Sequence, residues 1–514
     1  MKRIVHLIVL LSAPLAFGQS TTSTLLDQNN ISTEIADGGV YFNRISDNQH
    51  GYEVPSGSGK HAMYSLSYWF GALDVISDLK IAAPTYDSQS DIFPGPLTQN
   101  TLQPANWPSS VFPITRDEIN AHAANYMNPG YVTPASILNW PAHGDVSLGF
   151  DYYLAPFYDF DSNGSYEPSA GDYPCILGDK AVYVITNDNG GVHATGGDAL
   201  GIEIHTLFYQ FNMGNDLNDA TFAHVKVINR SVEAYQDFRM TIFADADLGN
   251  FLDDYMGTDP SRNMMFTYSG DQYDEDFSGM LGYGDHPPAI AVKSLDRTLA
   301  SSGPFRPAAT PVEYWNLMHG LDPTTGLNWT SPIGLFTNFI YPGDPTDSTE
   351  YSEVNQSNVP GDRRMIYTIT ENELLPGGTF EHDYVVLFSG ADTNNLTNVT
   401  NLYAIADEAQ AFYDTNLQDQ CAEAGALSIP SIEPLSFQLF PNPTSGKFTI
   451  RLDEKMAGSM LSISTLAGKI ILTKEISEMN HEITLDLDAP TGIYFVKIEN
   501  EQSQHVQKLI LGTP

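Results

Sequence analysis

Apolar and polar positions alternate along six stretches of the chain, which is the pattern of half-buried β-strands. Two of them form a pair joined by a polar connection, and the full set is 181–186, 202–211, 224–229, 238–243, 365–370 and 384–389. Gly, Pro, Asn and Asp interrupt the alternation at short intervals, as between the strands of antiparallel sheets. The pattern therefore predicts a mainly β fold with a β-sandwich-like body and long loops, rather than βαβ units.

The end of this body changes to a helical period. Leu396, Val399, Tyr403, Ala406 and Ala409 recur at spacings of three and four, which places them on one face of an α-helix. We expect this one late helix to pack on a sheet as part of the core.

A second β-rich segment follows, over residues 436–514. Phe448, Ile450 and Leu452 share one strand face, and Ile483 and Leu485 share another. Turn residues divide this segment into roughly seven short strands, which predicts a small C-terminal immunoglobulin-like β-sandwich.

The two β-rich parts differ in their net charge. The chain has 514 residues and a formal net charge of −40, from 63 acidic and 23 basic side chains. Residues 436–514 hold nine acidic and seven basic side chains, so nearly all the acidity lies before them. We expect a body over 19–426, for which a division near residue 215 is one alternative, a linker over 427–435 and a tail domain over 436–514. Nucleic acid and anionic membranes are excluded as partners because they would be repelled.

The first residues have the order of a secretory signal peptide. Lys2 and Arg3 precede an apolar run to Leu15, and small residues follow at Ala16 and Gly18. We therefore predict a leader over 1–18, and no later apolar run is long enough to predict a membrane span. Export would permit a disulfide between the two cysteines, Cys175 and Cys421, and the sequence leaves this open.

Three motifs of the tail resemble a known family, the type A C-terminal sorting domain of the type IX (Por) secretion system. They are LFPNPTSGKFTI at 439–450, GIYFVKI at 492–498 and QKLIL at 507–511. The resemblance implies recognition of residues 436–514 by the type IX secretion machinery. It also implies removal of this domain and display of the body on the outer surface of a Gram-negative bacterium.

Segments of the body resemble a group of uncharacterised secreted proteins that carry the same sorting domain. The resemblance spans about residues 159–290 and rests on short motifs at 172–174, 201–203, 245–249, 282–284 and 287–289. It brings no known activity with it.

The sharpest candidate chemistry is a calcium loop. Asp159, Asp161 and Asn163 alternate before Gly164, and Ser165 would add its carbonyl oxygen, as in the first half of an EF-hand loop. Position 12 is Ala170, so the shell would have to be closed by Glu167 or Asp172, as in a calcium loop of an extracellular β-protein. The alternative is an Asx-rich turn that its own backbone closes.

A second acidic cluster follows a predicted strand. Asp245 and Asp247 should project to the same side, and Asp253 and Asp254 follow them. Two carboxylates 4 Å apart repel by about 4 kcal/mol at an effective dielectric constant of 20, so a bound divalent ion would offset this repulsion. The alternative is that solvent separates these charges. We expect solvation for a third set, at Asp271, Asp274, Glu275 and Asp276.

No catalytic motif is found. The chain lacks an HExxH zinc motif, a GxSxG nucleophile elbow and a Walker phosphate loop. His193 and His205 flank a strand and are expected to be structural rather than metal ligands. Aromatics at 68–70, Trp107, Trp140 and Trp315 are expected in the core, with a sugar-stacking platform as the alternative.

These observations predict a secreted, surface-displayed β-rich protein that structural calcium stabilises, with a binding or adhesive role and no catalysis. A surface glycan hydrolase that uses a carboxylate pair is the alternative, because 63 acidic residues do not exclude such a pair.

Overall fold

A computed structural model describes residues 22–44, 49–86, 90–98, 110–417, 437–452, 459–465, 469–476, 482–499 and 504–512. The predicted leader, the predicted linker, Trp107 and Cys421 lie outside these residues. The chain divides into two compact units, residues 1–422 and 423–514, and each is described by itself.

The larger sheet of the first unit has nine antiparallel strands among the described residues, in the order β10-β14-β15-β16-β25-β20-β19-β18, with β11 also beside β14. Their bounds are β10 Phe93–Pro94, β11 Val111–Thr115, β14 Lys180–Asn187, β15 Ile202–Gln210, β16 Ala220–Asn229, β18 Asp254–Asp259, β19 Met264–Ser269, β20 Ala289–Ser294 and β25 Thr379–Ser389. β15 and β16 flank residue 215 and pair with each other in this sheet.

The second sheet has six strands, in the order β21-β24-β17-β8-β3, with β9 beside β8. Their bounds are β3 Val40–Tyr41, β8 Ser65–Leu73, β9 Leu79–Ala82, β17 Tyr235–Ala246, β21 Ser301–Pro304 and β24 Arg363–Leu374. The predicted pair 224–229 and 238–243 corresponds to β16 and β17, which belong to different sheets. The short polar connection between them therefore carries the chain from one sheet to the other.

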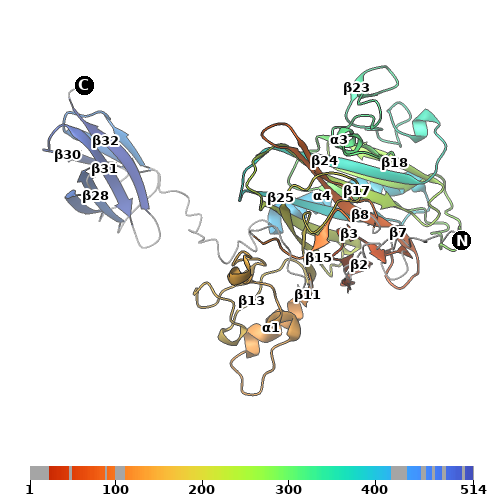
Figure 1. The fold of residues 1–514 in the computed structure, drawn as a ribbon, viewed down its shortest axis with the longest axis horizontal. Helices are drawn as coiled ribbons and strands as arrows, with labels where there is room; N and C mark the ends of the chain where they lie inside the picture. Colours follow the sequence, from red (N-terminus) through yellow and green to blue (C-terminus); the bar gives the residue numbers. More distant parts are fainter. Residues whose placement is uncertain are drawn as a thin grey trace, which may run out of the picture. The chain divides into compact units, whose positions relative to one another are not determined.

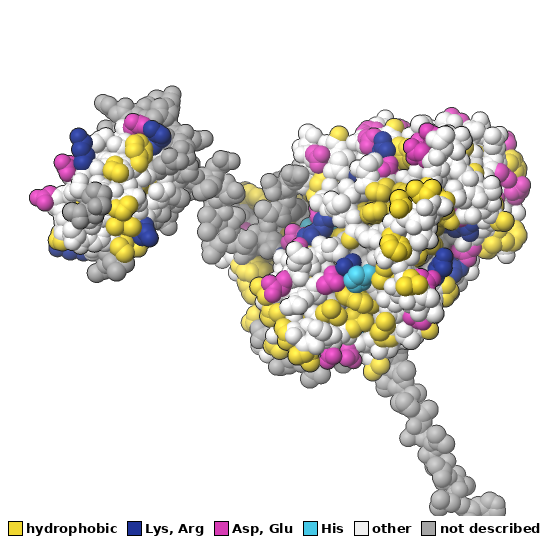
Figure 2. All heavy atoms as spheres, turned by 90° about the horizontal axis from the view of Figure 1, so that it is seen from above, with side chains coloured by type: hydrophobic (Ala, Val, Ile, Leu, Met, Phe, Trp, Pro, Cys, Tyr) yellow, Lys and Arg dark blue, Asp and Glu magenta, His cyan; other side chains and the backbone are white. Residues whose placement is uncertain are grey.

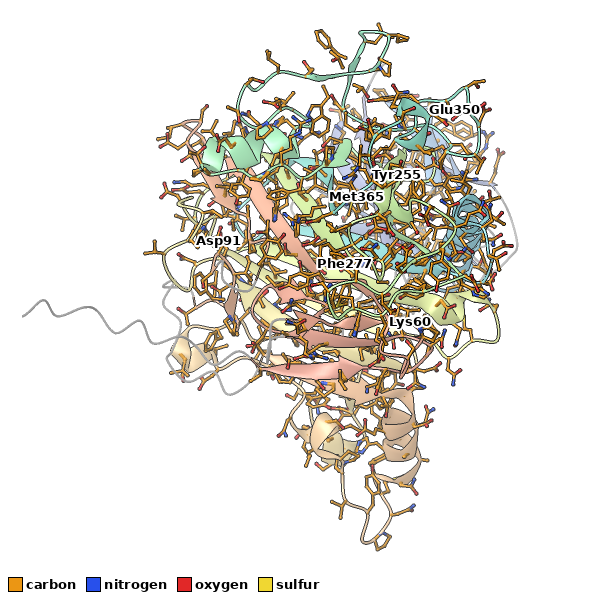
Figure 3. The ribbon with its side chains drawn as sticks, turned by 90° about the vertical axis from the view of Figure 1, so that its right-hand side faces the viewer. Lys60, Asp91, Tyr255, Phe277, Glu350 and Met365 are labelled. Carbon is orange, nitrogen blue, oxygen red and sulfur yellow. The ribbon has the colours of Figure 1, made fainter. Side chains whose placement is uncertain are left out.

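The two sheets face each other across one core, so the predicted β-sandwich-like body is confirmed. Tyr68 on β8 and Tyr384 on β25 join their hydroxyls across this core at 2.7 Å. The hydroxyl of Tyr367 on β24 lies 2.9 Å from Nε2 of His382 on β25. Figure 3 shows Met365 within the sandwich, whereas Glu350 lies in loops at its upper edge.

Helices cover the outer faces of the sandwich (Figure 1). α4, Asn395–Asn416, packs on β25, β20 and β19 and confirms the predicted late helix. α3, Pro311–Met318, packs on the second sheet around Trp69 and Phe243. The alternation of strands gave no sign of α3.

A lobe between β11 and β14 carries further short elements, visible below the sandwich in Figure 1. They are α1 Arg116–Asn125, α2 Ala135–Leu138, β12 Phe157–Tyr158 and β13 Tyr173–Pro174. Both α1 and α3 begin with a capping box, Thr115 with Glu118 and Thr310 with Glu313. This Thr-x-x-Glu spacing is a sequence signal that could have predicted both helices.

Short strands complete the first unit. β1 Ser23–Leu26, β2 Ser32–Ala36, β6 Tyr52–Glu53 and β7 His61–Met63 form a four-stranded sheet. Two-stranded ribbons are formed by β4 Asn43–Arg44 with β5 Gln49–His50 and by β22 Trp329–Thr330 with β23 Phe336–Thr337. Cys175, after β13, is disulfide-bonded.

The long loops of the body are held by buried carboxylates that accept backbone N–H groups. Asp91, labelled in Figure 3, accepts from Ala83 N and Thr195 N. Asp188 accepts from Leu200 N at 2.5 Å and Ile202 N at 2.8 Å. Each such bond satisfies a backbone amide, so part of the acidity serves as loop acceptors.

The second unit is a small two-sheet structure, as predicted. Its described strands are β26 Phe437–Phe440, β27 Lys447–Leu452, β28 Ser459–Thr465, β29 Ile470–Ile476, β30 Glu482–Asp486, β31 Gly492–Glu499 and β32 Gln504–Leu511. They form the sheets β26-β27-β30 and β29-β28-β31-β32. Phe448 and Ile450 of the first sheet share one core with Ile463 and Val496 of the second.

Candidate metal centre

Three carboxylates meet at one end of the second sheet. Asp245 lies near the end of β17, Asp247 follows it, and Asp362 directly precedes β24. In the register of these strands Asp245 lies opposite Arg364, which brings Asp362 beside Asp247. One ligand oxygen from each of the three aspartates lies within 4.8 Å of the others. The structure thus unites Asp245 and Asp247, as the alternation predicts, and adds Asp362.

Two of the three carboxylates are buried, and not all their oxygens have hydrogen-bond partners in the described part of the chain. Asp245 is 4% and Asp247 8% exposed. The Tyr86 hydroxyl donates to Oδ2 of Asp245 at 2.9 Å, and Nε2 of His50 lies 2.7 Å from Oδ2 of Asp247. Oδ1 of Asp245 and Oδ1 of Asp362 are buried and have no hydrogen-bond partner in the described part of the chain.

One positive side chain faces the three carboxylates. Arg364 places Nε 3.5 Å from Oδ2 of Asp245 and pairs with Asp362 through its terminal nitrogen. Burial lowers the pKa of His50 to about 4, so this imidazole is neutral near pH 7. Three ionised carboxylates and one guanidinium leave two negative charges in excess.

Burial and the neighbouring carboxylates disfavour this excess negative charge. Burial, followed by the charge of Asp247, raises the pKa of Asp245 to about 7. Burial, followed by the charge of Asp362, raises the pKa of Asp247 to about 7. Both carboxylates therefore either bind a proton or require a cation to stay ionised at neutral pH.

Asp253 and Asp254 lie outside this group of three. Oδ1 of each is buried without a partner among the residues described. Burial and then the charge of Asp274 raise the pKa of Asp253 to about 7. Burial and then the charge of Asp253 raise the pKa of Asp254 well above its ordinary value. Asp259, further along β18, is paired with Arg262 at 2.7 Å.

The prediction that Asp274 is solvated is wrong, although Asp271, Glu275 and Asp276 are exposed. Asp274 is buried and accepts from Asn250 N at 2.9 Å and Tyr283 N at 2.7 Å. Its carboxylate presses against Gly249, where a Cβ would lie 2.2 Å from Oδ2 of Asp274. Only glycine fits this contact, and its φ of 61° also favours glycine.

The predicted loop at 159–165 closes on its own backbone. Asp159 accepts from Asn163 N at 3.2 Å and from Gly164 N at 2.7 Å, and Asn163 Oδ1 accepts from Ser165 N at 2.7 Å. Asp172 is buried and accepts from Phe160 N and Glu167 N, and Asp161 is exposed. Gly164 adopts the predicted positive φ, 78°. This bonding pattern is that of the Asx-rich turn, and calcium binding at the loop stays a prediction.

The two histidines of the sequence analysis are structural, as expected. Nδ1 of His193 lies 2.9 Å from Ile81 O, and Nε2 lies 2.5 Å from Asp188 O. Nε2 of His205 lies 2.7 Å from Oε1 of Glu203, and Nδ1 lies 2.7 Å from the Tyr183 hydroxyl. Each imidazole uses both nitrogens within the protein.

The aromatic platform considered from the sequence is not found among its described members. Tyr68, Trp69, Phe70 and Trp140 are buried in the cores of the body. Trp315 is half-buried, with the guanidinium of Arg239 over its ring at 5.7 Å. These rings pack the sheets, as the core interpretation predicts.

The family model for the secretion system C-terminal sorting domain matches residues 438–512. The chain carries a type IX sorting domain over these residues, which confirms the resemblance and marks the protein for type IX secretion and surface attachment. No described helix is long and apolar enough to cross a membrane. No curated protein matches the chain.

Two solved structures show weak similarity. A polysaccharide lyase matches with 7% identity and a TM-score of 0.19, over 60% of this chain and 34% of its own. The adhesin domain of Epf from Streptococcus pyogenes matches with 9% identity and a TM-score of 0.14, over 58% of this chain and 82% of its own. The chain thus spans about a third of the lyase, and neither similarity bears on its function.

Proposed function

We propose that the body is a surface-displayed binding protein whose fold is stabilised by a calcium ion held by Asp245, Asp247 and Asp362. One observation carries the proposal: three carboxylates from two strand ends place their oxygens within 4.8 Å, although Asp245 and Asp247 are buried. Burying a carboxylate without a counterion costs roughly several kcal/mol per charge.

The charge of the cluster matches a divalent cation. Arg364 neutralises one of the three carboxylates, and two negative charges remain. The unpartnered Oδ1 atoms of Asp245 and Asp362 are available to a cation without breaking a hydrogen bond within the described chain.

Calcium is the divalent ion that suits this donor set and compartment. The three ligands are hard carboxylate oxygens, and Ca²⁺ prefers about 6–8 oxygen ligands in a flexible arrangement. Extracellular modules bind it with dissociation constants of about 10⁻⁴–10⁻³ M, which extracellular calcium suffices to fill. Type IX export delivers the body to that environment.

The burial of this cluster argues against glycan hydrolysis at these carboxylates. A glycosidase needs two carboxylates on either side of a bound sugar, about 5 Å or more apart and open to the substrate. Asp245 and Asp247 are at most 8% exposed, so a polysaccharide has no access to both. The cluster fits an ion rather than a sugar.

Calcium should raise the melting temperature of the full chain. At 100 times the dissociation constant a ligand adds about 2.7 kcal/mol, which for a unit of this size corresponds to about 3 °C. We expect the melting temperature to fall in chelator, to recover with calcium, and to be unaffected by sodium at equal ionic strength. Identical melting curves in chelator and in calcium would contradict the proposal.

Binding without turnover is the second expectation. Incubation of the full chain with a panel of polysaccharides should release no reducing ends, because we assign the body a binding role and the buried Asp245 and Asp247 are closed to a sugar chain. Release that increases with time and protein concentration would support the hydrolase alternative instead.

A further inference from the structure

The lobe between β11 and β14 exposes tyrosines that the core does not use. Tyr152 is 39% and Tyr153 41% exposed, while Phe157 between the lobe's loops is buried. Adjacent exposed aromatic rings with hydroxyl tips suit a ligand that is apolar on one face and polar at its edge.

The two tyrosines are held in position before any ligand arrives. The His143 ring stacks on Tyr152 with centroids 4.0 Å apart and planes at 18°, and Tyr153 meets Tyr152 edge-on at 4.9 Å. Nε2 of His143 accepts from Tyr166 N at 2.8 Å, so Nδ1 carries the proton and donates to Tyr152 O at 3.1 Å. Fixed rings lose little entropy on binding.

The acidic loop at 159–165 supports the tyrosine tips. The Tyr153 hydroxyl donates to Gly164 O at 3.3 Å, and the Tyr152 hydroxyl lies 3.4 Å from Ser165 Oγ. The loop in turn is closed by Asp159, which accepts from Gly164 N. Exposed Asp161 and Asn163 add hydrogen-bonding groups to the same loop.

We infer that Tyr152 and Tyr153, with the loop at 159–165, form a binding site for neutral polysaccharides. A pyranose ring offers a C–H face to an aromatic ring and hydroxyls to the phenol and carboxylate oxygens around it. The net charge of −40 repels uronate-containing or sulfated chains, which leaves neutral ones. The inference rests on the proposed binding role and supplies its ligand class.

On the face shown in Figure 2, Asp and Glu side chains occur in small groups, several beside a Lys or Arg, among uncharged surface. The net negative charge of the protein repels an anionic polysaccharide and does not act on a neutral one.

Affinity electrophoresis of the full chain tests the inference. Native gels would contain laminarin, xylan or galactomannan as neutral probes and alginate as the anionic probe. At least one neutral polysaccharide should retard the protein, and Tyr152→Ala and Tyr153→Ala should each weaken binding about tenfold. Tyr152→Phe should keep most of the affinity, because the ring is retained.

Tyr273→Ala is the matched control, because Tyr273 is 51% exposed in another loop of the body, and it should bind like the parent. Unchanged melting temperatures would show that the variants are folded. No retardation by any neutral probe, parent-like binding by both alanine variants, or equal retardation by alginate would overturn the inference. The calcium response of the melting temperature is read at a different cluster, so either proposal can fail without the other.

Discussion

Replacing Asp247 by asparagine should abolish the stabilisation of the protein by calcium and raise its stability in chelator. Asparagine keeps an oxygen for Nε2 of His50, which lies 2.7 Å from Asp247, but it removes one buried charge. Calcium should raise the melting temperature of the parent by about 3 °C and leave that of the variant unchanged, so that the parent is the more stable protein in calcium. Without calcium the order should reverse.

The reversal has a definite pH dependence. The pKa of Asp247 is about 7 in the folded protein, against an ordinary value of 3.8, so folding takes up protons between these limits. In chelator, the parent should therefore lose stability as the pH rises from 3.8 to about 7, and the loss should level off above that pH. The advantage of Asp247→Asn should be largest above pH 7 and vanish below the ordinary value of 3.8.

Asp161→Asn provides the comparison, since Asp161 is the exposed aspartate of the other predicted calcium loop. Thermal melts of parent and both variants, in chelator and in calcium, assign the response to one site. Loss of the response in Asp161→Asn alone would move the calcium site to the loop at 159–165. A full response in Asp247→Asn would refute the assignment to Asp247.

Replacing Glu203 by glutamine should destabilise the body by about 3 kcal/mol at pH 7. Glu203 is fully buried on β15 and accepts from Arg230 at 2.8 Å, from Leu97 N at 2.7 Å and from Nε2 of His205 at 2.7 Å. Burial alone would raise its pKa, but the bonds from His205 and Arg230 prevail and lower it to about 2. Glutamine leaves Arg230 without its buried counter-charge.

The contribution of Glu203 to stability should increase with pH, whereas that of Asp247 in chelator decreases with pH. The pKa of Glu203 in the folded protein lies below its ordinary value of 4.5, so the ionised form stabilises the protein above pH 4.5. That contribution is lost as the pH falls toward 2. Denaturant unfolding should show a large difference between parent and Glu203→Gln near pH 7 and a smaller one near pH 3.

Glu381→Gln is the control, because Glu381 is half exposed and lies 3.9 Å from Lys226. An exposed pair of this kind contributes at most about 1 kcal/mol. Equal losses in the two variants at pH 7 would contradict the role assigned to the buried Glu203 network.

The strands of the body were predictable because their alternation reflects a local rule, that successive side chains point to opposite faces. β14, β24 and β25 contain the stretches predicted from it, and β15 contains its predicted stretch except for residue 211. The partners of these strands were not predictable from alternation. β16 and β17 are consecutive yet lie in different sheets, because pairing depends on contacts between distant segments.

The candidate metal centre divides in the same way. Asp245 and Asp247 could be found because a strand places alternate residues on one side. Asp362 could not, because only the pairing of β17 with β24 brings it to them from a distant part of the chain. The burial of Asp274 could not be predicted from its own acidic run. The two backbone N–H groups that donate to it belong to Asn250 and Tyr283, which lie outside that run.

The sequence by itself determined the β-rich class, the late helix and the sorting domain, since each is written in a local period or motif. Tertiary structure alone decided which acidic residues are loop acceptors, which are exposed and which converge on one point. The physical reason is that the ionisation and burial of a carboxylate depend on neighbours in space, and the folding of distant segments supplies those neighbours.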